Sequence, residues 1–264
     1  MTAALITGAS GGIGEAFARR LASEKHDLFL VARSEDKLQK LCAELSAAHG
    51  IKANYIAADL GEPDSDAKIF DETRRLGLHI DLLINNAGFG SMGDFVDLDR
   101  EKELAMIDLN VRALVALTHR YLPAMREKRN GTIINVSSAA GEQPLPFMAT
   151  YAATKAFVTS FSMAVAEENR LFGVQVFALC PGPTRSNFFE AGKIDKSLML
   201  KGEQTTDEVV ATAMAAIGAG KTKVISGLMN RVTAVAARLA PDSLVTRVVA
   251  SQLRKKFQSG EHGK

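Results

Sequence analysis

Short apolar runs alternate with longer amphipathic stretches along most of this chain. Apolar runs that predict strands cover residues 3–7, 28–32, 53–58, 80–84, 132–136, 174–179 and 223–226. The stretches between them repeat apolar residues at helical spacing, as Leu38, Leu41 and Leu45 do. They predict a helix that passes through Ile13 and Leu21, and further helices over residues 35–48, 63–76, 98–128, 150–172 and 207–217.

The strands have unbroken apolar runs rather than alternating ones, which is typical of strands buried on both faces. Strands of this kind joined by helices form right-handed βαβ units. We therefore predict an α/β fold with a doubly wound, mainly parallel seven-stranded sheet and helices on both faces. The chain contains no repeat and no flexible linker, so residues 1–226 are predicted to form one domain.

The region from residue 227 to residue 264 has a different pattern. Leu228, Val232, Val235 and Leu239 form one apolar stripe, and Pro241 interrupts the helix. A second amphipathic helix, capped by Asp242 or Ser243, follows with basic residues on it. We predict a C-terminal helical extension packed on the domain or on a subunit partner. A surface that contacts anionic lipid is a less favoured alternative.

Composition and charge exclude several classes of protein. The chain has 264 residues, of which 47% are hydrophobic and 23% charged, so it is neither disordered nor of low complexity. A net charge of +2 argues against nucleic acid as the main partner, although residues 221–264 alone carry +7. Two separate cysteines and five scattered histidines predict neither a disulfide framework nor a metal site. No basic, apolar leader opens the chain, and no run of 18 apolar residues occurs, so we expect a cytoplasmic protein.

A glycine-rich turn joins the first predicted strand to the first helix. It reads TGASGGIG over residues 7–14. Glycines let the backbone approach a ligand closely, and the free N–H groups of the helix favour an anion such as a pyrophosphate. The position of the turn therefore predicts a dinucleotide-binding site of the Rossmann type.

Further polar motifs follow the later strands. Asn85 and Asn86 end the fourth strand, where they can face a cofactor ribose or lock neighbouring strands together. Ser137 and Ser138 follow the fifth strand. Tyr151 and Lys155 stand four residues apart near a helix start and therefore share a face. Taken singly, each motif is as typical of a turn or a surface pair as of a catalytic site.

In this order and spacing the motifs resemble the short-chain dehydrogenase/reductase family. The resemblance rests on TGxxxGxG, NNAG, a serine thirteen residues before the tyrosine, YxxxK, and Pro181-Gly182, and it extends from about residue 2 to residue 226. It implies an oxidoreductase that transfers hydride between a nicotinamide cofactor and a carbonyl or alcohol substrate. An alternative from another class is a catalytically silent protein of the same fold that senses a dinucleotide.

The resemblance also implies roles for individual residues. Tyr151 would be the general acid in carbonyl reduction, with Lys155 lowering its pKa, and Ser138 would hydrogen-bond the substrate oxygen. Asn110 would help to hold a water that leads to Lys155. The cofactor would contact both Tyr151 and Lys155, together with Gly8, Ser10, Gly11, Gly12, Ile13, Gly14, Asp59, Leu60, Asn86, Ala87, Gly88, Pro181, Gly182 and Thr184.

The end of the second strand predicts which nicotinamide is used. An acidic residue there would repel a 2′-phosphate, but the sequence has Ala32, followed by Arg33 and Ser34. Arginine can bind a phosphate with two hydrogen bonds and serine can add another, so we predict NADP(H).

Apolar residues near the predicted site indicate a moderately lipophilic ketone or aldehyde as substrate. The candidates are Phe89, Leu145, Phe147 and Phe188, with residues 184–199 as a mobile apolar lid. The resemblance further implies subunit contacts through the helices at 110–128 and 150–172, and hence a homodimer or homotetramer.

Overall fold

The computed structural model describes residues 2–186, 188, 203–239 and 241–260, and these contain a seven-stranded sheet. Every strand pairs in parallel with its neighbours, in the order β3-β2-β1-β4-β5-β6-β7. The strands are β1 (Thr2–Thr7), β2 (Asp27–Ala32), β3 (Ala53–Ala57), β4 (His79–Asn85), β5 (Gly131–Val136), β6 (Val174–Cys180) and β7 (Lys223–Ile225). The predicted doubly wound α/β fold is therefore confirmed.

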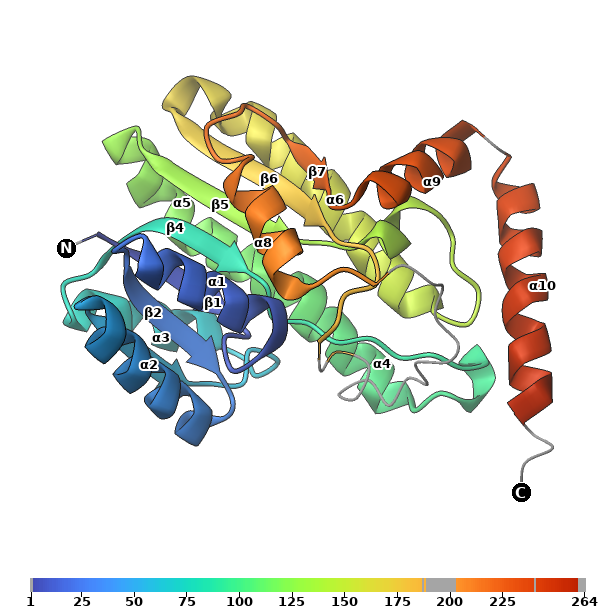
Figure 1. The fold of residues 1–264 in the computed structure, drawn as a ribbon, viewed down its shortest axis with the longest axis horizontal. Coiled ribbons are helices and arrows are strands. Elements are labelled where there is room, and N and C mark those ends of the chain that lie inside the picture. Colours follow the sequence, from blue (N-terminus) through green and yellow to red (C-terminus); the bar gives the residue numbers. More distant parts are fainter. Residues whose placement is uncertain (1, 187, 189–202, 240, 261–264) are drawn as a thin grey trace.

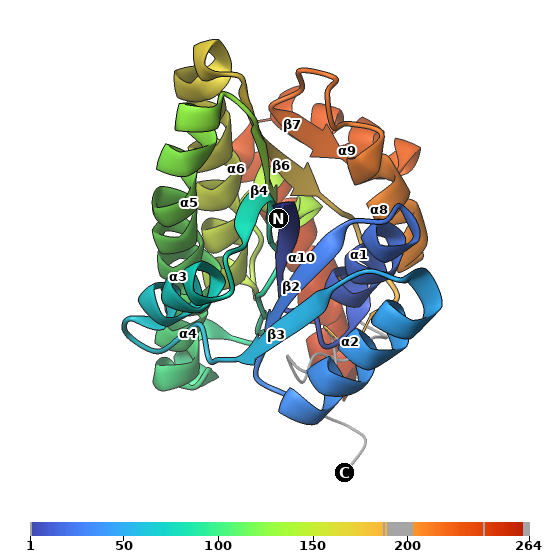
Figure 2. The ribbon, with the colours of Figure 1, turned by 90° about the vertical axis from the view of Figure 1, so that its left-hand side faces the viewer.

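Helices cover both faces of the sheet (Figure 2). On one face lie α1 (Gly12–Ser23), α2 (Glu35–His49) and α8 (Thr206–Met214), and on the other lie α3 (Ser65–Arg75), α5 (Leu114–Lys128) and α6 (Ala149–Asn169). Each layer has its own core. Phe17, Leu38 and Val209 are buried with the strands on the first face, and Ile69, Leu117 and Val165 on the second. Burial of strand side chains in both cores explains the unbroken apolar runs.

The strand order reverses between β1 and β4, because β2 and β3 extend the sheet in one direction and β5 to β7 in the other. Ligands of open parallel sheets bind beyond the carboxyl ends of the strands at such a reversal. The carboxyl ends of β1, β4, β5 and β6 are therefore brought side by side, and with them the segments that follow each strand.

The long helical region predicted over residues 98–128 is present from Arg100 to Lys128. It begins with α4 (Arg100–Ile107), continues through a π-helical segment, η2 (Asp108–Ala113), and ends with α5, and a short 3₁₀ turn, η1 (Phe95–Asp97), precedes it. A π turn holds an extra residue within the helix and is frequent at functional sites. Here it places Asn110 inside the fold, where the residue is fully buried. Two further 3₁₀ turns, η3 (Ala139–Glu142) and η4 (Arg170–Phe172), flank α6.

The C-terminal extension consists of α9 (Leu228–Leu239) and α10 (Asp242–Gly260). The predicted break at Pro241 is present between them. Figure 1 shows α9 leading away from β7 and α10 standing outside the body of the domain, beyond the carboxyl edge of the sheet. Leu228 and Val232 of the predicted stripe are exposed, and so is Leu244 on α10. The domain boundary at residue 226 stays a prediction.

None of the helices in the described part of the chain is long and apolar enough to cross a membrane. Most of the predicted lid, residues 189–199, lies outside the described residues, whereas Phe188 lies within them.

Candidate active site

The glycine-rich turn between β1 and α1 lies at the carboxyl edge of the sheet, and we call it the glycine cradle. Gly8 and Gly12 have φ angles of +66° and +60°, a conformation that favours glycine. Gly11 precedes α1, and no side chain caps the first N–H groups of this helix. The positive end of α1 is therefore free to bind an anion, as the sequence predicts.

Asn86 holds the glycine-rich turn against the end of β4. Its Nδ2 donates to the Thr7 carbonyl at 2.9 Å, and its backbone N–H donates to Thr7 Oγ1 at 2.9 Å. The backbone N–H of Ala87 donates to the same hydroxyl at 3.0 Å. A Cβ on Gly14 would lie 2.6 Å from Asn86 Nδ2, so only glycine fits there. Asn86 thus positions the cradle, and Thr7 is a buried residue of this site that the sequence analysis missed.

Asn85 instead links neighbouring elements by hydrogen bonds. Its Nδ2 donates to Asn135 Oδ1 on β5 at 2.8 Å and to Thr118 Oγ1 on α5 at 3.1 Å. Asn135 in turn donates to Ser162 Oγ on α6 at 3.0 Å. Of the two alternatives for the asparagine pair, strand locking therefore describes Asn85. Ser137 is also internal, because its hydroxyl donates to the Lys155 carbonyl at 2.7 Å.

Ser138, Tyr151 and Lys155 lie together beyond the ends of β5 and β6. The Ser138 hydroxyl caps η3 by accepting from the Ala140 N–H at 3.1 Å, and it also hydrogen-bonds Tyr151. Lys155 Nζ lies 5.8 Å from the centre of the Tyr151 ring. The ammonium is held by the Val136 carbonyl, to which it donates at 2.9 Å. The three side chains predicted from separate motifs thus share one buried site.

Burial acts on these two ionisable groups in opposite directions. It raises the pKa of Tyr151 to about 12, which the hydrogen bond from Ser138 offsets only in part. It lowers the pKa of Lys155 to about 8, because the buried ammonium is poorly solvated. The sequence analysis expected Lys155 to lower the pKa of Tyr151. In this structure burial of the phenol outweighs the hydrogen bond from Ser138, and the expected effect of Lys155 and of a bound oxidised nicotinamide stays a prediction.

Asn110 connects this site to the segment after β4. Its Oδ1 accepts from the Phe89 N–H at 3.1 Å, and its Nδ2 donates to the Phe89 carbonyl at 2.9 Å. The same Nδ2 donates to Thr154 Oγ1 at 3.1 Å, one residue before Lys155. A Cβ on Gly88 would meet Asn110 Oδ1 at 2.8 Å and Lys155 Nζ at 3.4 Å. The π turn therefore brings the NNAG segment and α6 together.

Apolar side chains surround the phenol of Tyr151. Its ring centre lies 5.3 Å from that of Phe188, and it packs in one cluster with Met106 of α4 and Met148. Phe89, Met92 and Leu145 contact the same cluster. Phe147 is not part of it, and its carbonyl accepts from the Gly93 N–H at 2.9 Å. Three of the four predicted substrate residues thus belong to the cluster around Tyr151, together with three methionines that the sequence analysis did not single out.

The ends of β2 and β3 carry the residues predicted to select the cofactor. The Arg33 side chain is 78% exposed, and its guanidinium lies 3.9 Å from the Asp59 carboxylate. Ser34 precedes α2, but its hydroxyl does not cap that helix. Asp59 also accepts from the Gly61 N–H at 2.8 Å, and Leu60 beside it is buried. Arg33, paired with Asp59 but largely exposed, and Ser34 thus both lie at the end of β2, where a phosphate is predicted to bind.

The Pro181-Gly182 turn is held by a residue of the C-terminal extension. A Cβ on Gly182 would lie 2.1 Å from Nδ2 of Asn230, at the start of α9. Asn230 Nδ2 donates to the Ser226 carbonyl at 2.8 Å and to Gln204 Oε1 at 3.3 Å. Gln204 pairs with Thr184 in a short parallel bridge, and the Ala139 N–H donates to the Pro181 carbonyl at 2.8 Å. Asn230 was missed because nothing near it in the sequence marks it.

Comparisons with known proteins agree with this geometry. Residues 2–196 match the short chain dehydrogenase family. The chain belongs to this family. It is similar to the very-long-chain 3-oxoacyl-CoA reductase of Anas platyrhynchos, with 34% identity over 81% of this chain and 68% of that protein. Among several curated relatives, the match spans 56–68% of the relative's length.

Two solved dehydrogenase structures are similar over most of this chain. One is a short-chain dehydrogenase from Sphingobium yanoikuyae in complex with NADPH, with 34% identity, a TM-score of 0.82, and coverage of 98% of this chain and 96% of that one. The other is an alcohol dehydrogenase from the archaeon Thermococcus sibiricus complexed with 5-hydroxy-NADP, with 28% identity, a TM-score of 0.73, and coverage of 83% and 91%.

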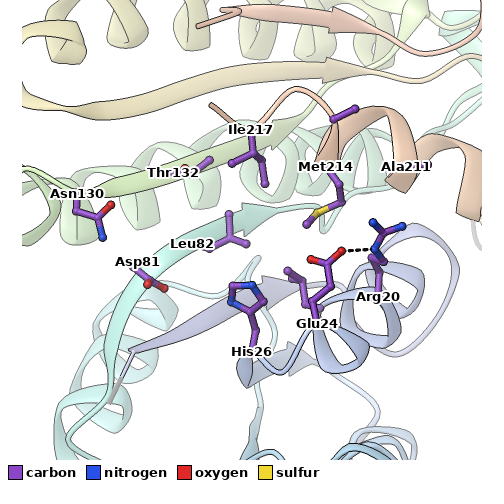
Figure 3. Close-up of a pocket in the computed structure, with 12 residues that line it drawn as sticks. Arg20, Glu24, His26, Asp81, Leu82, Asn130, Thr132, Ala211, Met214 and Ile217 are labelled. Atoms are coloured by element: carbon purple, nitrogen blue, oxygen red, sulfur yellow. Dashed lines mark hydrogen bonds and ion pairs between the residues drawn. The ribbon is translucent and has the colours of Figure 1, made fainter. Parts of the chain in front are cut away.

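A separate cavity of this short-chain dehydrogenase lies at the opposite edge of the sheet. It measures about 560 Å³ and is lined by residues of α1, the amino ends of β4 and β5, and α8 (Figure 3). Arg20, Glu24, His26 and Asp81 are its charged or titratable side chains. It is remote from the carboxyl ends of the strands, beside which Tyr151 lies on α6. Among the described residues, no group of three histidine, cysteine or acidic side chains is placed to hold a metal ion.

Proposed function

We propose that this short-chain dehydrogenase is an NADP(H)-dependent oxidoreductase that interconverts a carbonyl compound and its alcohol, with Tyr151 as the group that gives or takes the proton. The observation that carries the proposal is the convergence of Ser138, Tyr151 and Lys155 beside the glycine cradle. Oxidoreductase chemistry itself is common to the relatives, which include a 3-oxoacyl-CoA reductase and an alcohol dehydrogenase.

The cradle fits the cofactor of those relatives. The uncapped start of α1 offers N–H donors to a pyrophosphate, and Gly8 lets the turn pack closely on Asn86 and Ala87, where a Cβ would overlap them. Arg33 and Ser34 suit the 2′-phosphate that distinguishes NADP(H), and both solved relatives contain NADPH or an NADP analogue. When bound, the nicotinamide supplies or accepts the hydride.

In carbonyl reduction the protein's own groups would act as follows. Ser138 donates a hydrogen bond to the carbonyl oxygen, on which negative charge develops. Tyr151 gives that oxygen its proton, and burial keeps the phenol protonated because its pKa is about 12. The nearby ammonium of Lys155 stabilises the phenolate that remains. Asn110 fixes the Phe89 backbone and Thr154, and through them the walls of the site.

The apolar cluster around Tyr151 favours a moderately lipophilic ketone or aldehyde as substrate. Phe89, Leu145 and Phe188 offer contact to carbon rather than to charge. Among the described residues, we assign the hydroxyls of Ser138 and Tyr151 to the reacting oxygen. A substrate with an apolar body and one carbonyl therefore fits the site best.

A turnover assay tests this function. The protein is mixed with NADPH and a panel of aliphatic, cyclic and aromatic ketones and aldehydes, and loss of NADPH absorbance is followed. We expect turnover of at least one lipophilic carbonyl. Tight NADPH binding without turnover across the panel would instead support a dinucleotide-sensing protein of the same fold.

The same assay includes NADH and the variant Arg33→Ala as a control on the cofactor. Removal of the guanidinium should weaken the binding of NADPH by about ten-fold or more, which corresponds to one lost charge-assisted hydrogen bond. NADH should be almost unaffected, because it has no 2′-phosphate. Equal losses for both cofactors would contradict a phosphate contact at Arg33.

A further inference from the structure

Helices α9 and α10, residues 228–260, form an arm whose apolar side chains are left uncovered. Leu228 and Met229 on α9 are more than 70% exposed, and Leu244 and Val248 on α10 are 54% and 47% exposed. Leu244 and Val248 are four residues apart and share one face of α10. Helices are usually stabilised by packing of such a face rather than by propensity alone.

A second uncovered apolar surface lies on the main domain, at η1 and α4. It consists of Phe95, Val96, Leu104 and Ile107, which are 63%, 84%, 42% and 43% exposed. We call it the η1–α4 patch. Phe95 and Val96 are adjacent in a surface 3₁₀ turn, and Leu104 and Ile107 are three residues apart on α4, one helical turn. Neighbouring exposed apolar groups, as in each of these two pairs, mark interaction surfaces more often than isolated ones do.

The two surfaces carry opposite charge. Residues 228–260 contain six basic and one acidic residue, a net charge of +5. Residues 94–108 contain six acidic and two basic residues, a net charge of −4. Asp94 and Asp97 directly flank Phe95 and Val96 and are exposed, and Arg247 and Arg254 are exposed on α10. An apolar stripe edged with positive charge thus matches an apolar patch edged with negative charge.

The arm does not cover the patch of its own chain, because Phe95 and Val96 are among the most exposed large apolar residues of the described chain. The arm nevertheless lies beyond the same edge of the sheet as the patch, so it is presented outward for another molecule. A second copy of this chain carries the complementary surface. In a symmetric dimer the arm of each copy can therefore contact the patch of the other.

We propose that the α9–α10 arm of one copy docks on the η1–α4 patch of a second copy. Leu244 and Val248 cover Phe95 and Val96 across this contact, and Arg247 faces the acidic residues beside them. Phe95 and Val96 lie outside the helices at 110–128 and 150–172, through which the family resemblance implies subunit contacts. It also stands independently of the proposed function.

Site-specific cross-linking tests this contact. Two differently tagged chains are prepared, one with Val96→Cys and the other with Val248→Cys, and treated after mixing with a short bis-maleimide. The native Cys42 and Cys180 are buried and should not react. The expected result is a product of two chains that carries both tags. Ser243→Cys, an exposed position off the stripe of the same helix, serves as the matched control and should give a much lower yield.

Two outcomes would overturn the proposal. A single chain that carries both cysteines and cross-links only within itself would show that the arm folds back on its own domain. Equal yields for Val248→Cys and Ser243→Cys would show random collision.

The competing lipid partner is tested with vesicles of phosphatidylcholine and phosphatidylserine. If the protein pellets with them and Leu244→Asp/Val248→Asp abolishes pelleting, while no two-chain product forms, the arm is a membrane surface instead.

Discussion

Tyr151 and Lys155 lie one turn apart on α6, and burial shifts their pKa values in opposite directions. Tyr151 is buried among apolar side chains, which keeps the phenol neutral and ready to donate a proton. Lys155 is buried as well, and its pKa of about 8 means that its charge is lost within an accessible range of pH. The pair therefore combines a fixed proton donor with a titratable cation.

This difference predicts the pH dependence of the reaction. Below pH 8 Lys155 is charged, and above it the group becomes neutral and no longer stabilises a phenolate. Since kcat/KM for NADPH reports the free enzyme, we expect it to be flat at lower pH and to fall about ten-fold per unit above about pH 8. Tyr151 should add no further step up to pH 11, because its pKa is about 12.

Lys155→Arg provides the control for this assignment. An arginine stays charged over the whole range, so the residual activity of the variant should lack the fall near pH 8. If the fall persists in Lys155→Arg, another group is titrating.

At the scale of single elements, α9 holds the loop that follows β6. Asn230 fills the space above Gly182 and is itself held by Ser226 and Gln204. Asn230 of the C-terminal extension thereby fixes the loop that follows β6. If Pro181, Gly182 and Thr184 contact the cofactor as proposed, α9 contributes to cofactor binding without touching the cofactor.

A pair of substitutions tests this support. Gly182→Ala adds a Cβ that would overlap Asn230, and overpacking of this kind typically costs about 1–3 kcal/mol. We expect NADPH affinity, measured by fluorescence titration, to fall by about ten-fold. Adding Asn230→Ala should restore part of that loss, because it removes the overlapping side chain. Unchanged affinity in Gly182→Ala, or no recovery in the double variant, would contradict the role of Asn230.

The elements differ in how far the sequence could predict them. The strands were predictable because their apolar runs pack into cores on both faces, and the motifs were predictable because each follows a strand end. The π turn at Asn110 was not, because its apolar spacing differs little from that of a continuous helix. It is selected by tertiary hydrogen bonds to Phe89 and Thr154. Asn230 and Met148 likewise depend on contacts between distant segments.

At the scale of the whole molecule, one edge of the sheet gathers the glycine cradle, the Ser138–Tyr151–Lys155 group and the loop at Gly182. The reversal between β1 and β4 makes this possible, since it opens the edge where both halves of the sheet meet. The η1–α4 patch adjoins the same region, because Met106 of α4 packs in the cluster around Tyr151. A docked arm from a second copy would therefore lie next to the substrate side of the site.

The most direct test of the central claim is Tyr151→Phe, which removes the hydroxyl and keeps the ring that packs on Phe188. NADPH affinity and kcat/KM for a reducible carbonyl are measured on the variant and the wild type. The account predicts affinity within about two-fold and a loss of at least ~10²-fold in kcat/KM, the usual contribution of a positioned proton donor. Carbonyl reduction at the wild-type rate in Tyr151→Phe would contradict it.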